Sequence, residues 1–191
     1  MATIVWFRDD LRVADHPALA DAANAPDGVV CVYVWDESSA EVRPLGGAAK
    51  WWLHHSLGAL QRSLAGLGVP LVLRRGAAEQ VIPALVREVG ATRVLWNRRY
   101  GPEREIDARL KLALREQGVA ANSYLGGLLH EPWTVLPGEG TPFRVYSPFW
   151  RATLRLPEPA APIAAPSSLT PAIRRPESDL LDSWRLTPSA P

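Results

Sequence analysis

Residues 29–35 of the chain are Val-Val-Cys-Val-Tyr-Val-Trp, an apolar run of strand length without a charged side chain. A strand that faces solvent on one side alternates apolar and polar residues, whereas a strand covered on both faces is apolar throughout. Strands of the second kind occur mainly in parallel sheets that have helices on both sides. The run therefore predicts an α/β fold in which residues 29–35 form a covered strand.

The sequence around this run alternates between strand-like and helix-like patterns. Further strands are predicted at residues 3–7, 71–73, 93–96 and 119–125. Helices are predicted at about 15–23, with Asp15 as the N-cap, at 53–67 from a stripe of leucines, at 77–89 and at 103–117. Pro83 lies inside the third of these helices and weakens the prediction of its first turn. The order predicts a doubly wound, Rossmann-like, mostly five-stranded parallel sheet with helices on both faces.

The sequence after residue 126 no longer follows this alternation. Aromatic residues recur between 129 and 151, which predicts that this stretch packs on the domain. From Pro157 onward the composition changes to Pro, Ala, Ser and Thr, which is typical of linkers. The predicted organisation is an α/β domain over residues 1–155 and a Pro-rich interdomain linker or disordered tail over residues 156–191. Trp184 is the one large apolar side chain of this tail and could dock on a partner outside the chain.

Charge and cysteine content narrow the class of protein. There are 21 basic and 20 acidic residues, a net charge of +1, which argues against a stand-alone nucleic-acid-binding domain. Cys31 is the single cysteine, so a disulfide framework is excluded and a cytoplasmic location is the simplest expectation. No signal peptide is evident, and no apolar run approaches the ~20 residues that span a bilayer. No membrane association is therefore expected.

Ligands of doubly wound sheets bind at the carboxyl ends of the strands, where the strand order reverses. Polar and aromatic residues follow three of the predicted strands there. Lys50, near the start of the leucine-striped helix, could point along the same edge. The candidate binding residues are Arg8, Asp9, Trp35, Asp36, Glu37, Lys50, Asn97, Arg98, Arg99 and Tyr100.

Each of these patterns also has a structural explanation. Arg8, Asp9, Asp10 and Arg12 could form an ion-pair network that fixes the first loop. Trp51 and Trp52 are expected to pack in a core or an interface, and Arg98-Arg99 could be a solvated loop. Adjacent His54 and His55 diverge on a helix, so no metal site is predicted. The glycines form neither G-x-G-x-x-G nor a phosphate-binding loop, which leaves ordinary NAD binding and P-loop hydrolysis unsupported.

Two motifs carry a resemblance to a known family. Residues 4–19 read IVWFRDDLRVADHPAL, and residues 141–150 read TPFRVYSPFW. Both resemble signatures of the DNA photolyase/cryptochrome family, W-F-R-x-D-L-R-x-x-D-N-x-A-L and G-x-P-Y-x-V-F-T-P-F-W, with His16 in place of the usual asparagine. The resemblance spans roughly residues 3–155.

The resemblance implies the N-terminal, light-harvesting domain of a photolyase that repairs cyclobutane pyrimidine dimers. Family members bind an antenna chromophore there, and methenyltetrahydrofolate is the first expectation because arginines and Lys50 could meet its glutamate tail. A deazaflavin, FMN or no antenna are the alternatives. The family implies that FAD, damaged DNA and the repair reaction belong to a larger C-terminal helical domain, so this chain alone is not expected to be catalytic. Many relatives carry an acidic residue before the proline after the fourth strand, but here Gly101 precedes Pro102, so that carboxylate is missing.

Two other functions are compatible with the same residues. A photosensory cryptochrome shares this domain with the repair enzymes. A nucleotide-binding or interaction module of Rossmann-like type is the third possibility.

Overall fold

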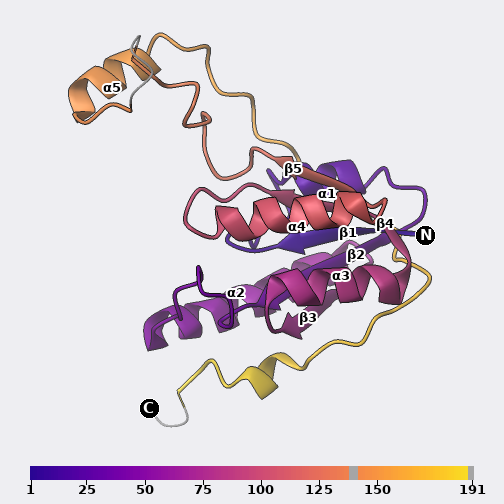
Figure 1. The fold of residues 1–191 in the computed structure, drawn as a ribbon. Helices are drawn as coiled ribbons and strands as arrows, with labels where there is room; N and C mark the ends of the chain where they lie inside the picture. The colour runs from indigo at the N-terminus through magenta and orange to yellow at the C-terminus, as the bar shows by residue number, and fades with distance from the viewer. Residues whose placement is uncertain (138–141, 189–191) are drawn as a thin grey trace.

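The structure is a computed structural model that describes residues 1–137 and 142–188 of the chain (Figure 1). Strands and helices alternate through the first 124 residues. The elements are β1 (Ala2–Phe7), α1 (Pro17–Ala22), β2 (Val29–Trp35), α2 (Gly47–Gly66), β3 (Leu71–Arg75), α3 (Ala78–Val89), β4 (Ala91–Asn97), α4 (Arg104–Glu116), β5 (Ala120–Tyr124), α5 (Tyr146–Thr153) and a short 3₁₀ helix η1 (Leu181–Trp184). Each predicted strand lies within two residues of an observed one.

The five strands form one parallel sheet in the order β3-β2-β1-β4-β5. The chain winds outward from β1 to β3 and then crosses back to place β4 on the other side of β1. This crossing is the strand-order reversal of a doubly wound sheet, and it places the switch point between β1 and β4. The predicted doubly wound α/β fold is confirmed.

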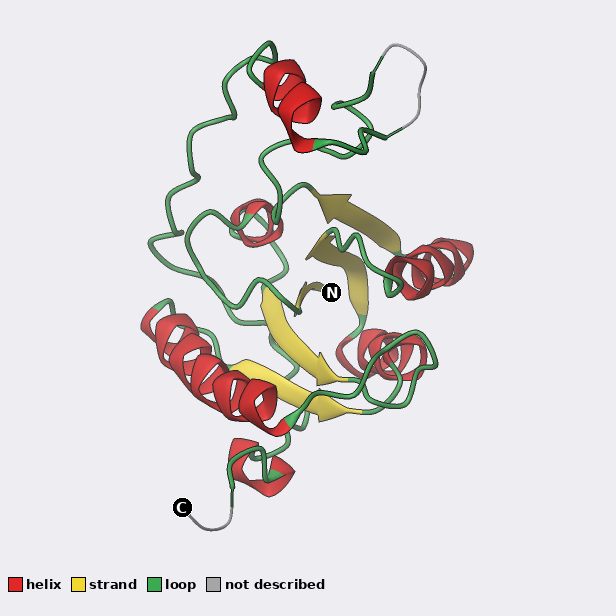
Figure 2. Cartoon of the chain, turned by 90° about the vertical axis from the view of Figure 1, so that its left-hand side faces the viewer, coloured by secondary structure: helices red, strands yellow, loops and turns green. Residues whose placement is uncertain are grey.

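Helices cover both faces of the sheet, as Figure 2 shows end-on. Leu53, Leu57, Leu60 and Leu64 of α2 pack with α1 on one face, and β2 contributes its odd-numbered residues to the same core. On the other face, α3 and α4 pack against residues that include Trp6 and Trp96. All seven residues of β2 are buried, which is the environment that its apolar sequence predicted.

The start of α1 differs from the prediction. The N-cap is His16, whose Nδ1 accepts a hydrogen bond from the backbone N–H of Leu19 at 3.0 Å. Asp15 lies one residue earlier with φ of 50° and instead bonds with Ile163 of the C-terminal stretch. The imidazole supplies the acceptor that a capping Asp usually provides. In α3, Pro83 is buried inside the helix, which nevertheless runs unbroken over its 12 residues.

The stretch with α5 projects from the sheet and does not pack on it (Figure 1). None of the residues of α5 is buried, and Tyr146, Phe149 and Trp150 are exposed. The prediction that this aromatic stretch packs on the domain is therefore wrong for α5. Thr141, the first residue of the second family motif, lies outside the described residues.

Part of the C-terminal tail packs on the domain. Leu169, Ala172, Trp184 and Leu186 are buried against it, and Val29 forms a parallel bridge with Pro171. Trp184 thus docks on its own chain rather than on an outside partner. The division at residue 155 stays a prediction, although these four residues of the tail belong to the cores of the sheet domain.

Within the described part of the chain, no helix is both long and apolar enough to cross a membrane.

Candidate functional site

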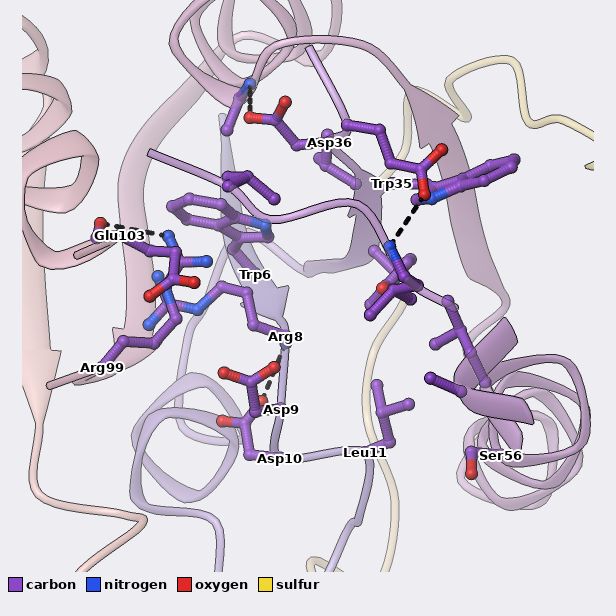
Figure 3. Close-up of a pocket in the computed structure, with 18 of the residues that line it drawn as sticks. Trp6, Arg8, Asp9, Asp10, Leu11, Trp35, Asp36, Ser56, Arg99 and Glu103 are labelled. Carbon is purple, nitrogen blue, oxygen red and sulfur yellow. Dashed lines mark hydrogen bonds between the residues drawn. The ribbon is translucent and has the colours of Figure 1, made fainter. Parts of the chain in front are cut away.

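A cavity of about 550 Å³ opens at the carboxyl ends of the strands (Figure 3). The loops after β1 and β2 form most of it, and the loop after β4 and the first half of α2 complete it. Its volume falls within the roughly 300–1,000 Å³ of typical small-molecule sites. The lining residues are Trp6, Arg8, Asp9, Asp10, Leu11, Arg12, Tyr33, Val34, Trp35, Asp36, Glu37, Val42, Arg43, Leu45, Ala49, Trp52, Leu53, Ser56, Ala78, Arg99 and Glu103.

Four aromatic residues, Trp6, Tyr33, Trp35 and Trp52, belong to the cavity wall. Trp6 comes from the α3/α4 face of the sheet, whereas Tyr33 and Trp35 come from the α1/α2 face. The cavity therefore crosses the top edge of the sheet between its two cores, with Trp6 and Trp35 on different sides of it in Figure 3. Trp52 of α2 also lines the cavity although 69% of its surface is exposed. Trp51 and Trp52 are both exposed, so neither packs in the core of this chain, and the alternative of packing in an interface stays a prediction.

Arg8 serves the fold as well as lining the cavity. Its Nη1 donates to both carboxylate oxygens of Asp107, at 3.0 and 2.9 Å, and its Nη2 donates to the backbone carbonyl of Asn97. Its guanidinium carbon lies 4.4 Å from the centre of the Trp6 ring. Burial lowers the pKa of Arg8 to about 10, although the charge of Asp107 opposes this shift. Arg99 shares the same partner, with Nη2 2.6 Å from Asp107 Oδ1.

Asp9 and Glu103 are the less committed carboxylates of the cavity, although Asp9 was considered for the ion-pair network of the first loop. Asp9 is exposed and makes no side-chain hydrogen bond within the described ranges. Although the residue as a whole is exposed, its carboxylate lies among protein atoms at the cavity edge, and this partial loss of water raises the pKa of Asp9, while the charges of Arg99 and Arg8 partly oppose the shift. Glu103 lines the cavity from the loop before α4. Gly101 brings no carboxylate to the site, and Glu103 places a different carboxylate in the cavity wall.

The charged residues of the loop after β2 form hydrogen bonds and an ion pair with nearby residues of the chain. Asp36 accepts hydrogen bonds from Ser39 and from the backbone N–H of Ala78 at 2.9 Å, so it caps α3 from a separate loop. Burial alone would raise the pKa of Asp36, but these hydrogen bonds lower it below its ordinary value. Glu37 pairs with Lys50 at 3.1 Å. Lys50 does not belong to the cavity lining and lies 5.5 Å from the centre of the Trp35 ring.

A smaller hollow of about 210 Å³ lies beside the first, at the switch point between β1 and β4. It contains the predicted residues Asn97, Arg98 and Tyr100, which the larger cavity does not. Asn97 is buried and joins Asp10 to the first turn of α1. Arg98 and the Tyr100 hydroxyl both bond to Glu131, so neither belongs to a merely solvated loop. The two hollows share Arg8, Asp9, Asp10, Arg12, Arg99 and Glu103 and are contiguous.

Several lining residues were missed at the sequence level. Trp6 and Tyr33 look like ordinary strand residues, and only their position near the strand ends distinguishes them. The cavity is also lined by Leu45, Ala49 and Ser56, because the start of α2 lies beside the loop after β1. This proximity can be seen only in the tertiary structure. The chemistry that the cavity offers is binding: aromatic faces for a flat ring, with carboxylates and guanidinium groups at its edge.

Comparison with known proteins gives a consistent result. The family model for DNA photolyase matches residues 3–167. A deoxyribodipyrimidine photo-lyase of Agrobacterium fabrum is 47% identical over 189 residues, which cover 98% of this chain and 39% of that protein. Cryptochrome-1 of Arabidopsis thaliana is 38% identical over 172 residues, which cover 87% of this chain and 25% of that protein.

A solved structure agrees with these sequence relatives. A bacterial class III photolyase from Agrobacterium tumefaciens superposes with a TM-score of 0.93 at 46% identity, covering 100% of this chain and 39% of that one. The chain thus spans about two fifths of the length of its photolyase relatives. Because the family model covers most of the sequence and a curated photolyase shares close to half of its residues, the chain belongs to the DNA photolyase family.

Proposed function

We propose that this chain is the light-harvesting domain of a DNA photolyase and that its larger cavity holds an antenna chromophore. The observation that carries the proposal is the cavity itself: about 550 Å³ at the carboxyl ends of the strands, lined by Trp6, Tyr33, Trp35 and Trp52. A bound antenna absorbs near-ultraviolet or blue light and passes the excitation energy on without making or breaking bonds. The protein therefore has to hold a planar ring and keep it shielded from water.

The lining residues fit a pterin such as methenyltetrahydrofolate. Aromatic side chains can stack on its ring, and Asp9 and Glu103 offer acceptors for ring N–H groups. Arg12 and Arg99 line both hollows and provide positive charge for the glutamate tail. A deazaflavin or FMN has the same flat shape and is the alternative chromophore.

The rest of the activity is proposed for a further part of the protein. A C-terminal helical domain, which this chain does not contain, would bind FAD and damaged DNA and perform the repair. The exposed aromatic side chains of α5 suit an interface with that domain, because contiguous exposed aromatic surface marks sites of contact. A cytoplasmic location stays a prediction from the single, buried cysteine.

A pair of adjacent tryptophans provides the test. Trp52 lines the cavity, whereas Trp51 is exposed and packs on His55 outside it. The purified chain is titrated with 5,10-methenyltetrahydrofolate, and binding is followed by its absorption and fluorescence. We expect Trp52→Ala to weaken binding by about tenfold, as for the loss of one stacking ring, and Trp51→Ala to leave it unchanged.

A second matched pair tests the cavity by filling it. Ala49 and Ala59 are both exposed on α2, but only Ala49 lines the cavity. Ala49→Phe should block folate binding, and Ala59→Phe should not. If the unaltered chain binds neither folate, deazaflavin nor FMN, or if all four variants behave alike, the antenna proposal is wrong. ATP serves as the control ligand for the nucleotide-binding alternative.

A photosensory cryptochrome is the second candidate function, because a plant cryptochrome is among the sequence relatives. Light-dependent rescue of a repair-deficient bacterial strain by the full-length gene separates the two functions. Rescue supports the photolyase, and failure of an expressed, flavin-loaded protein to rescue supports the photoreceptor.

A further inference from the structure

Residues 163–186 form a strap that returns across the sheet domain on the β3 side (Figure 1). The backbone N–H of Leu169 donates to the carbonyl of Leu67 at 2.7 Å, and the N–H of Asp179 donates to the carbonyl of Leu73 at 2.9 Å. The Ser178 hydroxyl accepts from the N–H of Leu73 at 2.9 Å. The strap thus supplies partners for the outer side of β3, an edge strand, and is anchored immediately before η1.

The end of the strap places Trp184 behind the cavity wall. Trp184 is buried, and its Nε1 donates to Asp179 Oδ2 at 2.9 Å. Its ring centre lies 5.3 Å from that of Trp35 and 6.1 Å from that of Tyr33. Both of these rings line the cavity, but Trp184 does not. One buried indole of the strap therefore supports two of the aromatic residues of the proposed chromophore site.

Packing determines the orientation of Trp35. Its Nε1 is buried and has no hydrogen-bond partner in residues 1–137 and 142–188. Besides the apolar side chains of its core cluster, the ring has Trp184 and the cations of Arg75 and Lys50 as neighbours, and the charged groups of the two cations lie 4.3 and 5.5 Å from the ring centre. Of these three, only Trp184 is a buried aromatic side chain. Removing it would leave a space of indole size into which Trp35 could turn.

We infer that Trp184 is a positioning residue for the chromophore site, which acts by holding Trp35 and Tyr33 in the cavity wall. This inference rests on the proposed antenna function. It makes the strap part of the site, so that a displacement of residues 178–186 changes the shape of the cavity without touching the ligand.

The test compares two buried residues of the same strap. Leu186 is as well buried as Trp184 and belongs to the same core, but it does not form part of the cavity lining. Folate affinity and melting temperature are measured for the 191-residue chain and for Trp184→Ala, Trp184→Phe and Leu186→Ala. We expect Trp184→Ala to weaken folate binding by about tenfold and Leu186→Ala to leave affinity within about twofold at a similar loss of melting temperature. Trp184→Phe should restore most of the affinity, because an aromatic ring again packs on Trp35.

A second readout does not require a ligand. The indole N–H signal of Trp35, assigned with Trp35→Phe, is followed in ¹H–¹⁵N spectra of each variant. Because loss of the Trp184 ring current alone would shift this signal, the readout is the set of nuclear Overhauser effects from the Trp35 N–H to its neighbours, which should be lost or replaced in Trp184→Ala and kept in Leu186→Ala. Unchanged Overhauser effects in Trp184→Ala, or equal loss of affinity in both alanine variants, overturn the inference. If the unaltered chain binds no chromophore, the antenna proposal fails, and the Overhauser effects of Trp35 alone then decide whether Trp184 positions that ring.

Discussion

Asp10 offers a direct test of the network beneath the cavity, because its environment predicts a pH-dependent contribution to stability. Asp10 is 8% exposed; its Oδ1 accepts from the Arg8 N–H at 2.9 Å, and its Oδ2 accepts from Asn97 Nδ2 at 2.7 Å. His16 Nε2 lies 3.0 Å from Oδ2. Burial alone would raise the pKa of Asp10, but the neighbouring imidazole N–H of His16 and the backbone N–H and positive charge of Arg8 lower it to about 2.

The lowered pKa converts to a free energy of unfolding. The difference from the ordinary value of 3.8 corresponds to about 2 kcal/mol, at about 1.4 kcal/mol for each pH unit. Since the pKa is lower in the folded state, this stability is fully present above the unfolded-state pKa and is lost as the pH falls through about 2. At pH 3 roughly half of it remains.

The assay is urea unfolding of the unaltered chain and Asp10→Asn at pH 7, 5 and 3. Asn keeps the size of the side chain but removes the charge. Part of the loss in the free energy of unfolding therefore comes from altered hydrogen bonds and does not depend on pH. We expect the stability difference between the two proteins to be largest at pH 7 and 5 and to narrow by about 1 kcal/mol between pH 5 and pH 3. Asp27→Asn, on an exposed turn, should show no such narrowing. A difference that stays constant over this range would refute the assignment of a charged, stabilising Asp10.

Three further substitutions test other parts of the fold. Asp107→Asn should lower the free energy of unfolding by about 3–5 kcal/mol, because it leaves the Arg8 guanidinium buried without a carboxylate. In urea titrations, the double variant that also carries Arg8→Met should recover part of that loss. Gly28→Ala should lower the free energy of unfolding by at least about 1–2 kcal/mol, since φ of Gly28 is +80° and the added Cβ would lie 2.7 Å from a backbone oxygen of the strap. Gly47→Ala in α2 is the control and should not lower the free energy of unfolding. Trp150→Ser on α5 should change stability by less than about 0.5 kcal/mol, because this exposed side chain contributes little to the isolated chain; a large loss of stability in calorimetry would contradict the detached position of α5.

The sheet and its helices were predictable because burial dictates their residue types. The apolar residues of β2 and the leucine stripe of α2 predicted buried positions, and the structure shows that these residues are buried. The N-cap of α1 was not predictable, since His16 takes a role that Asp15 fills more often. The strap was missed because its prolines and small residues are typical of linkers, while its anchoring depends on distant partners such as the edge of β3.

The sequence predicted the location of the candidate site at the carboxyl ends of the strands, but it predicted only some of the residues that line it. Polar and charged residues at the carboxyl ends of strands lie next to helix termini and other groups that need partners. Asp36 therefore caps α3, Asn97 joins Asp10 to α1, and Arg98 bonds to Glu131. The aromatic rings around the cavity are committed to different degrees, because the Arg8 guanidinium covers Trp6 and Trp184 packs on Trp35, whereas Trp52 is exposed. A chromophore in this cavity would therefore be selected mainly by its shape and its flat ring, and charge substitutions in these loops should reduce stability before they reduce affinity.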